Sequence, residues 1–160
     1  MIGSKNDCKK LTGLKQLIDT HSEWTAKAEP LQAVPGVGAV TATTLVAALP
    51  ELGQLSSKQI SCLVGLAPLN RDSGQFRGKR MITGGRAAVR CALYMATLVS
   101  IRFNPVIKSC YERLRSKGKL KKVALTACMH KLLIILNAMV KHGQSWQPRL
   151  AEQSSANASA

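Results

Sequence analysis

The chain has 160 residues, of which 46% are hydrophobic and only 4% aromatic. That length suffices for one compact domain, and a core built from Leu, Val, Ile and Ala favours packed helices over sheets. The formal net charge is +15, and residues 71–122 hold 14 of the 23 Lys and Arg residues against two acids. A single-sign charge concentrated in one segment points to a polyanionic partner rather than to general solubility.

Membrane, disulfide and metal-site signals are weak in this sequence. The first ten residues are polar and lack the apolar core of a signal peptide, and the uncharged stretch 91–101 is shorter than the roughly 20 residues that span a bilayer. We therefore expect a cytoplasmic protein. The five cysteines and three histidines are scattered without a C-x-x-C pair, so we expect no metal site and interpret most of the cysteines as small core residues.

Helical spacing of apolar residues predicts an all-α fold, a compact bundle of about five to six helices. The expected helices cover residues 9–29, a segment that ends near Leu49, a short segment capped by Ser56 or Ser57, then 86–103, 105–117 and 120–141. The helix over 86–103 is apolar on nearly all sides, so we expect it at the buried centre. For the last helix we expect an apolar seam at Val123, Ala127, Ile134 and Ala138. The Ser-, Ala- and Asn-rich tail over 143–160 is expected to be disordered.

The segment Val34-Pro-Gly-Val-Gly38 lies between two of the expected helices. It has the pattern of a helix-hairpin-helix, expected over residues 31–49, which binds DNA without reading its sequence. Gly36 and Gly38 would leave backbone N–H groups bare beside a helix N-terminus, which favours a phosphate. The alternative is an ordinary turn between two helices with no ligand.

A long basic loop is expected over residues 65–84, with a helix starting at Arg86. Its charge and glycines favour phosphate binding over a solvated loop, and an Arg fork can hold two phosphate oxygens at once. A second basic cluster surrounds Gly118 and forms either a backbone-contact site or a solvated turn. The phosphate-binding candidates in the two segments are Arg71, Arg77, Lys79, Arg80, Arg86, Arg90, Lys119, Lys121 and Lys122.

Ser73 lies beside Gly74 within the basic loop. A hydroxyl among arginines suits a nucleophile that attacks a phosphodiester. It equally suits a plain turn, because no general base is evident nearby. The residues alone leave this choice open.

Seven motifs in one unbroken order resemble a known family. They are V-P-G-V-G-x-V-T-A (34–42), G-L-A-P (65–68), D-S-G (72–74), G-K-R-x-I-x-G-G-R-x-x-V-R (78–90), R-F-N-P (102–105), G-K (118–119) and K-L-L-x-I-L-N (131–137). Together they look like the C-terminal transposase domain of the "one-ten" family of bacterial insertion sequences, over residues 31 to 146.

The resemblance implies a DNA transposase or recombinase of a mobile element. It implies that Ser73 is the catalytic nucleophile, which forms a phosphoserine intermediate while strands are cut and rejoined in DNA transposition. It also implies DNA and a structured guide RNA as partners, a homo-oligomer in the full-length enzyme, and a place at the bacterial nucleoid. Mg²⁺ is expected only in an acidic, resolvase-like N-terminal domain of the family, so we expect no cofactor bound by this chain.

The resemblance divides the chain into three parts. Residues 1–30 would be a linker helix, residues 31–142 the helical transposase domain and residues 143–160 the tail. We find no acidic domain, and Asp7, Asp19, Glu23 and Glu29 cannot replace it. The expectation is thus a truncated form whose activity depends on that domain. The alternatives are a non-catalytic helix-hairpin-helix module that binds DNA or RNA, and a basic scaffold that oligomerises through residues 123–141.

Overall fold

The computed structural model describes residues 22–68, 82 and 84–147, and this part of the chain is helical with no strand. The all-α prediction is therefore confirmed. The described helices are α2 (Ser22–Gln32), α3 (Ala39–Ala48), α4 (Ser57–Val64), α5 (Ala87–Phe103), α6 (Pro105–Ser116) and α7 (Lys121–His142). Their order and bounds follow the predicted helices closely, apart from residues 9–21 of the first, which lie outside the described part.

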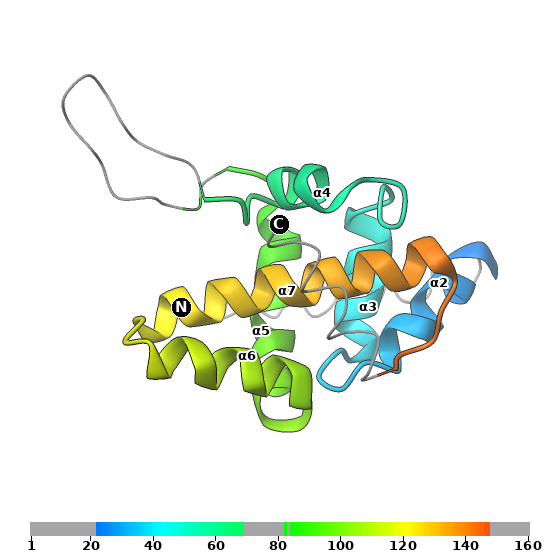
Figure 1. The fold of residues 1–160 in the computed structure, drawn as a ribbon. Helices are drawn as coiled ribbons and strands as arrows, with labels where there is room; N and C mark the ends of the chain where they lie inside the picture. The colour runs from blue at the N-terminus through cyan, green and yellow to red at the C-terminus, as the bar shows by residue number, and fades with distance from the viewer. Residues whose placement is uncertain (1–21, 69–81, 83, 148–160) are drawn as a thin grey trace, which may run out of the picture.

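Two helices organise the bundle. In Figure 1, α7 runs across the front of the molecule and α5 crosses behind it. α7 packs against α2, α4, α5 and α6, while α5 packs against α3, α4, α6 and α7. Between them lies a core of fully buried aliphatic side chains, which include Leu31, Leu45, Leu49, Ile60, Leu93, Leu132, Leu133 and Leu136. As the composition predicts, this core contains no aromatic residue among the described buried positions.

The long helix α7 would satisfy the length and hydropathy of a membrane span. Half of its most apolar 18-residue window, however, is buried inside the protein. The apolar residues of α7 therefore have protein partners, as in the core helix of a bundle.

Side-chain caps fix the starts of α4 and α6 where the sequence predicts them. Ser56 and Gln59 form a capping box, in which each side chain accepts a hydrogen bond from the other residue's backbone N–H, at 3.4 and 3.1 Å. The Asn104 Oδ1 accepts hydrogen bonds from the N–H groups of Val106 and Ile107, with Pro105 in the first turn. These two ends were readable from sequence because capping is local.

Two predictions about helix faces are wrong. α5 lies at the centre, but one of its sides faces solvent and exposes Tyr94, Met95, Leu98, Val99 and Phe103. In α7 the buried face does not follow the predicted seam, because Val123 is exposed and the neighbouring Ala124, with Cys128, Leu132, Ile135 and Met139, is buried. Both helices carry apolar residues on most sides, so periodicity could not select the face that the other helices cover.

The cysteine prediction holds for two of the four described cysteines. Cys110 on α6 and Cys128 on α7 are buried, and the Cys128 thiol points at the Ile107 carbonyl oxygen, 3.9 Å away. Cys62 and Cys91 are exposed, so for them the prediction is wrong. Cys8 lies outside the described residues.

Asn137 joins the connection between α3 and α4 to the middle of the bundle. Its Oδ1 accepts a hydrogen bond from the Gly53 N–H at 2.8 Å, and its Nδ2 donates to the Leu55 carbonyl at 2.9 Å. The side chain is 4% exposed, so these bonds form in a nearly dry environment. These two hydrogen bonds hold the connection between α3 and α4 against α7.

The turn between α2 and α3 packs its backbone directly on α5. Ser100, fully buried in α5, donates a hydrogen bond from its Oγ to the Pro35 carbonyl at 3.0 Å. The next residue, Gly36, has φ +100°, and a Cβ there would lie 2.1 Å from the Ser100 Oγ and 2.6 Å from its backbone nitrogen. Glycine is required at 36 by both conformation and space. At Gly38 neither limit applies, since a Cβ added there would meet no atom within 4 Å and φ is −84°.

These two glycines give a matched pair of substitutions. We expect Gly36→Ala to lower the free energy of unfolding by about 2–4 kcal/mol, because it combines a strained φ with a backbone clash. Gly38→Ala should change it by less than about 1 kcal/mol, since an extended N-cap residue tolerates a Cβ. Urea unfolding followed by circular dichroism measures both. Equal effects of the two changes would contradict the packing role of Gly36.

Candidate nucleic-acid interface

The two ends of the basic loop meet at α4. We call residues 65–68 and 84–86 the loop stem; both sides of it lie beside α4 in Figure 1. Gly65 has φ +77° and Gly85 has φ +66°, and a Cβ on either would lie 2.4 Å from the backbone of the other side of the stem. The Arg86 N–H also donates to the Leu63 carbonyl at 3.3 Å. The glycines thus allow backbone to pack on backbone and close the loop at its base.

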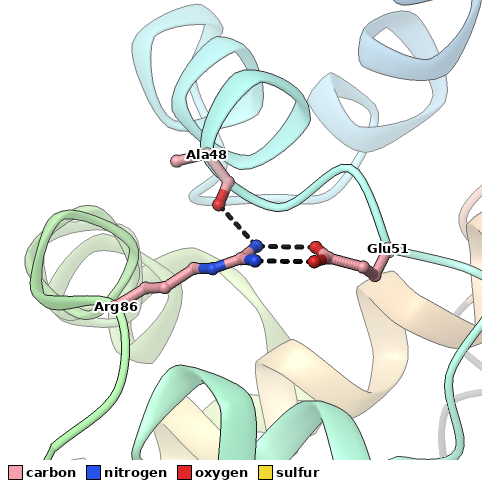
Figure 2. Close-up of polar contacts among 3 residues, drawn as sticks. All are labelled: Ala48, Glu51 and Arg86. Atoms are coloured by element: carbon pink, nitrogen blue, oxygen red, sulfur yellow. Dashed lines mark hydrogen bonds and ion pairs between the residues drawn. The ribbon is translucent and has the colours of Figure 1, made fainter.

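Arg86 fastens the stem to the end of α3. Figure 2 shows its guanidinium in a parallel pair of hydrogen bonds with the Glu51 carboxylate, both 2.6 Å, and in a third bond of 2.8 Å to the Ala48 carbonyl. This geometry is the bidentate fork for which Arg is suited. The hydrogen bonds from Arg86 hold the pKa of the Glu51 carboxyl below its ordinary value, and the bonds to Glu51 raise the pKa of Arg86.

Arg90, one helical turn further along α5, fastens the stem to α4. Its Nη1 donates to the Val64 carbonyl at 2.9 Å and also to the Gly84 carbonyl. The sequence predicts Arg86 and Arg90 as phosphate ligands. In the structure each guanidinium is bonded inside the protein, to different elements, so a phosphate would compete with these bonds.

An apolar groove opens between the loop stem and α7. Its volume is about 740 Å³, and it is lined by Leu66, Pro68, Ile82, Lys122, Val123, Thr126, Ala127 and His130. Burial lowers the pKa of His130, which favours the neutral imidazole. Among the described residues, the groove is therefore lined by apolar side chains, by His130 and by one cation, Lys122.

Six cations gather around the turn between α6 and α7. Their side chains are all exposed: Arg113, Arg115, Lys117, Lys119, Lys121 and Lys122. Gly118 makes the turn with φ +74°, and the Arg115 Nη1 donates to the Lys119 carbonyl. Among the residues that the structure describes, Arg86 and Glu51 form an ion pair, and none of these six cations forms one. We call this set the α6–α7 basic cluster; Lys122 connects it to the groove.

The structure brings only some of the predicted site residues together. Lys119, Lys121 and Lys122 lie in the α6–α7 basic cluster, whereas Gly36 and Gly38 lie in the turn between α2 and α3, which packs on α5. The predicted nucleophile Ser73 and the candidates Arg71, Arg77, Lys79 and Arg80 lie outside the described residues. No group of three or more His, Cys, Asp or Glu residues in the described part could hold a metal ion.

Sequence reasoning missed Glu51 as the partner of Arg86 and the groove beside the stem. Glu51 lies 35 residues from Arg86, and an isolated acid in a connection gives no signal of its partner. The groove had one weak signal, a histidine within the apolar sequence of α7. Its walls come from three separate segments, which no local pattern relates.

Residues 28–112 match the pattern of the transposase IS116/IS110/IS902 family. This match covers α3, α4, α5, both sides of the loop stem and most of α6. The chain belongs to this transposase family.

Curated relatives of this transposase chain extend the match into α7. It is 33% identical over 141 residues to the pilin gene-inverting protein of Moraxella bovis, which covers 86% of this chain and 44% of that protein. The corresponding protein of Moraxella lacunata is 32% identical over the same length. A protein of insertion element IS900 from Mycobacterium paratuberculosis is 33% identical over 125 residues, 76% of this chain and 31% of that protein. The chain thus spans less than half the length of these relatives.

The Glu51–Arg86 pair makes the stability of this transposase chain depend on pH. Because the pKa of Glu51 is lowered in the folded state, the pair stabilises the fold above the ordinary pKa of 4.5. That contribution disappears as the pH falls through the lowered pKa. We expect Glu51→Gln to lower the Tm at neutral pH, and the difference from wild type to shrink on acidification. Thermal unfolding from neutral to acidic pH measures it.

Glu112→Gln provides the control, because Glu112 is exposed on α6 and forms no ion pair among the described residues. We expect it to leave the Tm close to wild type across the same pH range. A Glu51→Gln difference that persists undiminished at acidic pH would contradict the ionic role of the pair.

Proposed function

We propose that this chain is the DNA-binding, serine-bearing part of an insertion-sequence transposase or recombinase. The observation that carries the proposal is the arrangement at the loop stem. Hydrogen bonds from Arg86 and Arg90, together with the backbone contacts of Gly65 and Gly85, hold the two ends of the basic, serine-containing loop together. The groove beside the stem is lined by Lys122, which also belongs to the α6–α7 basic cluster. A rigid base under a cationic loop is what presentation of a nucleophile to a phosphate requires.

DNA binding is supported by charge rather than by any base-reading element. The α6–α7 basic cluster carries six exposed cations without an acidic partner among the described residues. Such a surface attracts the phosphate backbone of either strand and positions it without regard to sequence. Arg71, Arg77, Lys79 and Arg80 of the loop would extend the same contact. Arg86 and Arg90 would serve chiefly to hold the loop, since their guanidinium groups already have internal partners.

In the proposed reaction the Ser73 hydroxyl attacks the phosphorus of a DNA phosphodiester. A bond forms between Oγ and phosphorus as the serine hydroxyl gives up its proton. The bond from phosphorus to one deoxyribose oxygen breaks, and that oxygen takes up a proton to become a free hydroxyl. Rejoining reverses these steps with the hydroxyl of another strand. Loop cations would stabilise the negative charge that builds on the non-bridging oxygens.

The acidic, Mg²⁺-binding part implied by the family resemblance has no counterpart in the described residues. Their carboxylates at Glu29, Glu51 and Glu112 come from separate elements, and Glu51 is already paired with Arg86. These residues do not fit a metal centre. The proposal is that activity needs an acidic domain acting with this chain.

The other partners belong to the same proposal. A structured guide RNA would compete for or share the basic surfaces, and the active assembly would be a homo-oligomer. The protein would work in the bacterial cytoplasm, at the nucleoid.

A second candidate is a non-catalytic module that binds DNA or structured RNA through a helix-hairpin-helix. It is favoured by one observation, the exposed Gly38 at the N-cap of α3, which places an uncrowded backbone beside a helix N-terminus. This module would bind nucleic acid without Ser73. Assays of binding and of covalent chemistry therefore separate the two candidates.

The lysines at the start of α7 test the binding surface. We expect the triple change Lys119→Gln, Lys121→Gln and Lys122→Gln to weaken binding to all DNA sequences alike. It should reduce the slope of log K against log salt by about 2–3, because each lost phosphate contact removes roughly 0.9. Fluorescence anisotropy with a labelled duplex at several salt concentrations measures the slope.

The matched control removes the same charge from exposed lysines on α2, on α4 and in the last turn of α7: Lys27→Gln, Lys58→Gln and Lys141→Gln. It should change the slope by less than about 1, since these lysines lie outside the proposed surface. If both triple variants lower the slope equally, the contact is diffuse and the assignment to the α6–α7 basic cluster is wrong.

The nucleophile is tested by trapping a covalent protein–DNA adduct on a denaturing gel. The chain is incubated with element-end DNA, with Mg²⁺, and with and without the remaining domain of a full-length family relative. We expect an adduct with wild type in the complete mixture, at least about a hundredfold less with Ser73→Ala, and no loss with Ser109→Ala on α6. Undiminished adduct in Ser73→Ala, or none with wild type, removes the catalytic proposal and leaves the binding module.

A further inference from the structure

The side of α7 that lines the apolar groove changes in chemistry along the helix. Five residues of α7 contribute to the lining: Lys122, Val123, Thr126, Ala127 and His130. The last four lie at the three- and four-residue spacing of a single helical stripe. Positions 122–130 span about 12 Å of helix. The groove thus has a cation at the start of α7, small side chains in the middle and a histidine at its far end.

The charged end of the groove suits a phosphate. Lys122 is exposed there and belongs to the α6–α7 basic cluster, whose cations form no ion pair among the described residues. Leu120, the N-cap residue of α7, has no side-chain acceptor for the N–H groups of the first turn. These N–H groups and the lysine favour an anion at the same place. The groove and the basic cluster therefore share one phosphate ligand, Lys122.

The rest of the groove suits a flat heterocycle. Its volume of about 740 Å³ lies within the range of small-ligand pockets, and Leu66, Pro68 and Val123 provide apolar walls. His130 is half-buried, and its neutral imidazole carries one N–H donor and one nitrogen acceptor. A nucleobase has apolar faces for the walls and a donor–acceptor edge for the imidazole. An acyl chain or an aliphatic side chain would offer the imidazole no hydrogen bond.

We propose that the groove takes up one unpaired nucleotide of the bound DNA, with its phosphate at Lys122 and its base against His130. A base inside a duplex cannot enter, because its neighbours cover its faces and its edge is paired. The nucleotide must therefore be unpaired already or be turned out of the helix. Cutting and rejoining of strands leaves bases transiently unpaired, so the reaction proposed above provides such a nucleotide. The subsite rests on the DNA binding proposed above and does not depend on the serine chemistry.

The test uses 2-aminopurine, a fluorescent base whose emission rises when it leaves the stack. The 160-residue chain is titrated with two labelled duplexes of the same flanking sequence, one with a single unpaired 2-aminopurine and one with that base paired to thymine. We expect fluorescence anisotropy to show at least about tenfold tighter binding of the unpaired form, and the 2-aminopurine emission to rise on binding. Equal affinity for the two duplexes, or an unchanged emission, overturns the proposal.

Two variants assign the effect to the groove. Ala127→Trp fills the groove, and His130→Leu removes the donor and acceptor while keeping a side chain of similar size. Each should reduce the preference for the unpaired base to less than about threefold. Affinity for the paired duplex should stay within about twofold of wild type, because the α6–α7 basic cluster is unchanged. If one variant does not fold, as judged by circular dichroism, the other decides.

Matched controls place the same changes outside the groove. Ala26→Trp on α2 and His142→Leu in the last turn of α7 alter exposed residues and should keep the full preference. A preference that the folded groove variants retain, or that the controls lose equally, overturns the subsite. If neither duplex binds, the proposed DNA-binding function fails together with the subsite, whereas equal binding of both duplexes removes the subsite alone. Loss of the serine chemistry would change neither measurement.

Discussion

The bond network of Arg86 is the interaction on which the arrangement of the site depends. One guanidinium joins the carbonyl end of α3, the Glu51 carboxylate after it and the start of α5. Because residue 86 is also the last residue of the loop stem, the same bonds fix where the basic loop returns to the bundle. Arg90 repeats this on the α4 side through the Val64 and Gly84 carbonyls. The two arginines convert what would be a long free loop into one with a rigid base.

Close backbone contacts make that base possible. Gly65 and Gly85 pack against each other's side of the stem, and Gly36 packs on Ser100 of α5. No side chain lies between the backbones at these contacts. The loop stem therefore packs near the start of α5, and the turn between α2 and α3 packs near its end. The helix that receives them is thereby fixed in position while its remaining face, from Tyr94 to Phe103, stays exposed.

Family membership and geometry together give the proposed site two surfaces with different chemistry. The α6–α7 basic cluster offers charge, and the groove with Lys122 and the neutral His130 offers an apolar recess that begins where the cluster ends. Leu66 and Pro68 of the loop stem line the same groove.

The all-α class, the helix order and the local caps at Ser56 and Asn104 could be predicted from the sequence, because these depend on neighbouring residues and on backbone hydrogen bonding. The sequence motifs also predict the transposase family, which the family match over residues 28–112 confirms. Which faces of α5 and α7 are buried depends on tertiary packing, since both helices are apolar on most sides. Tertiary packing alone paired Arg86 with Glu51, 35 residues away, and assembled the groove from three segments. Those features arise from contacts between distant parts of the chain, and no local spacing encodes them.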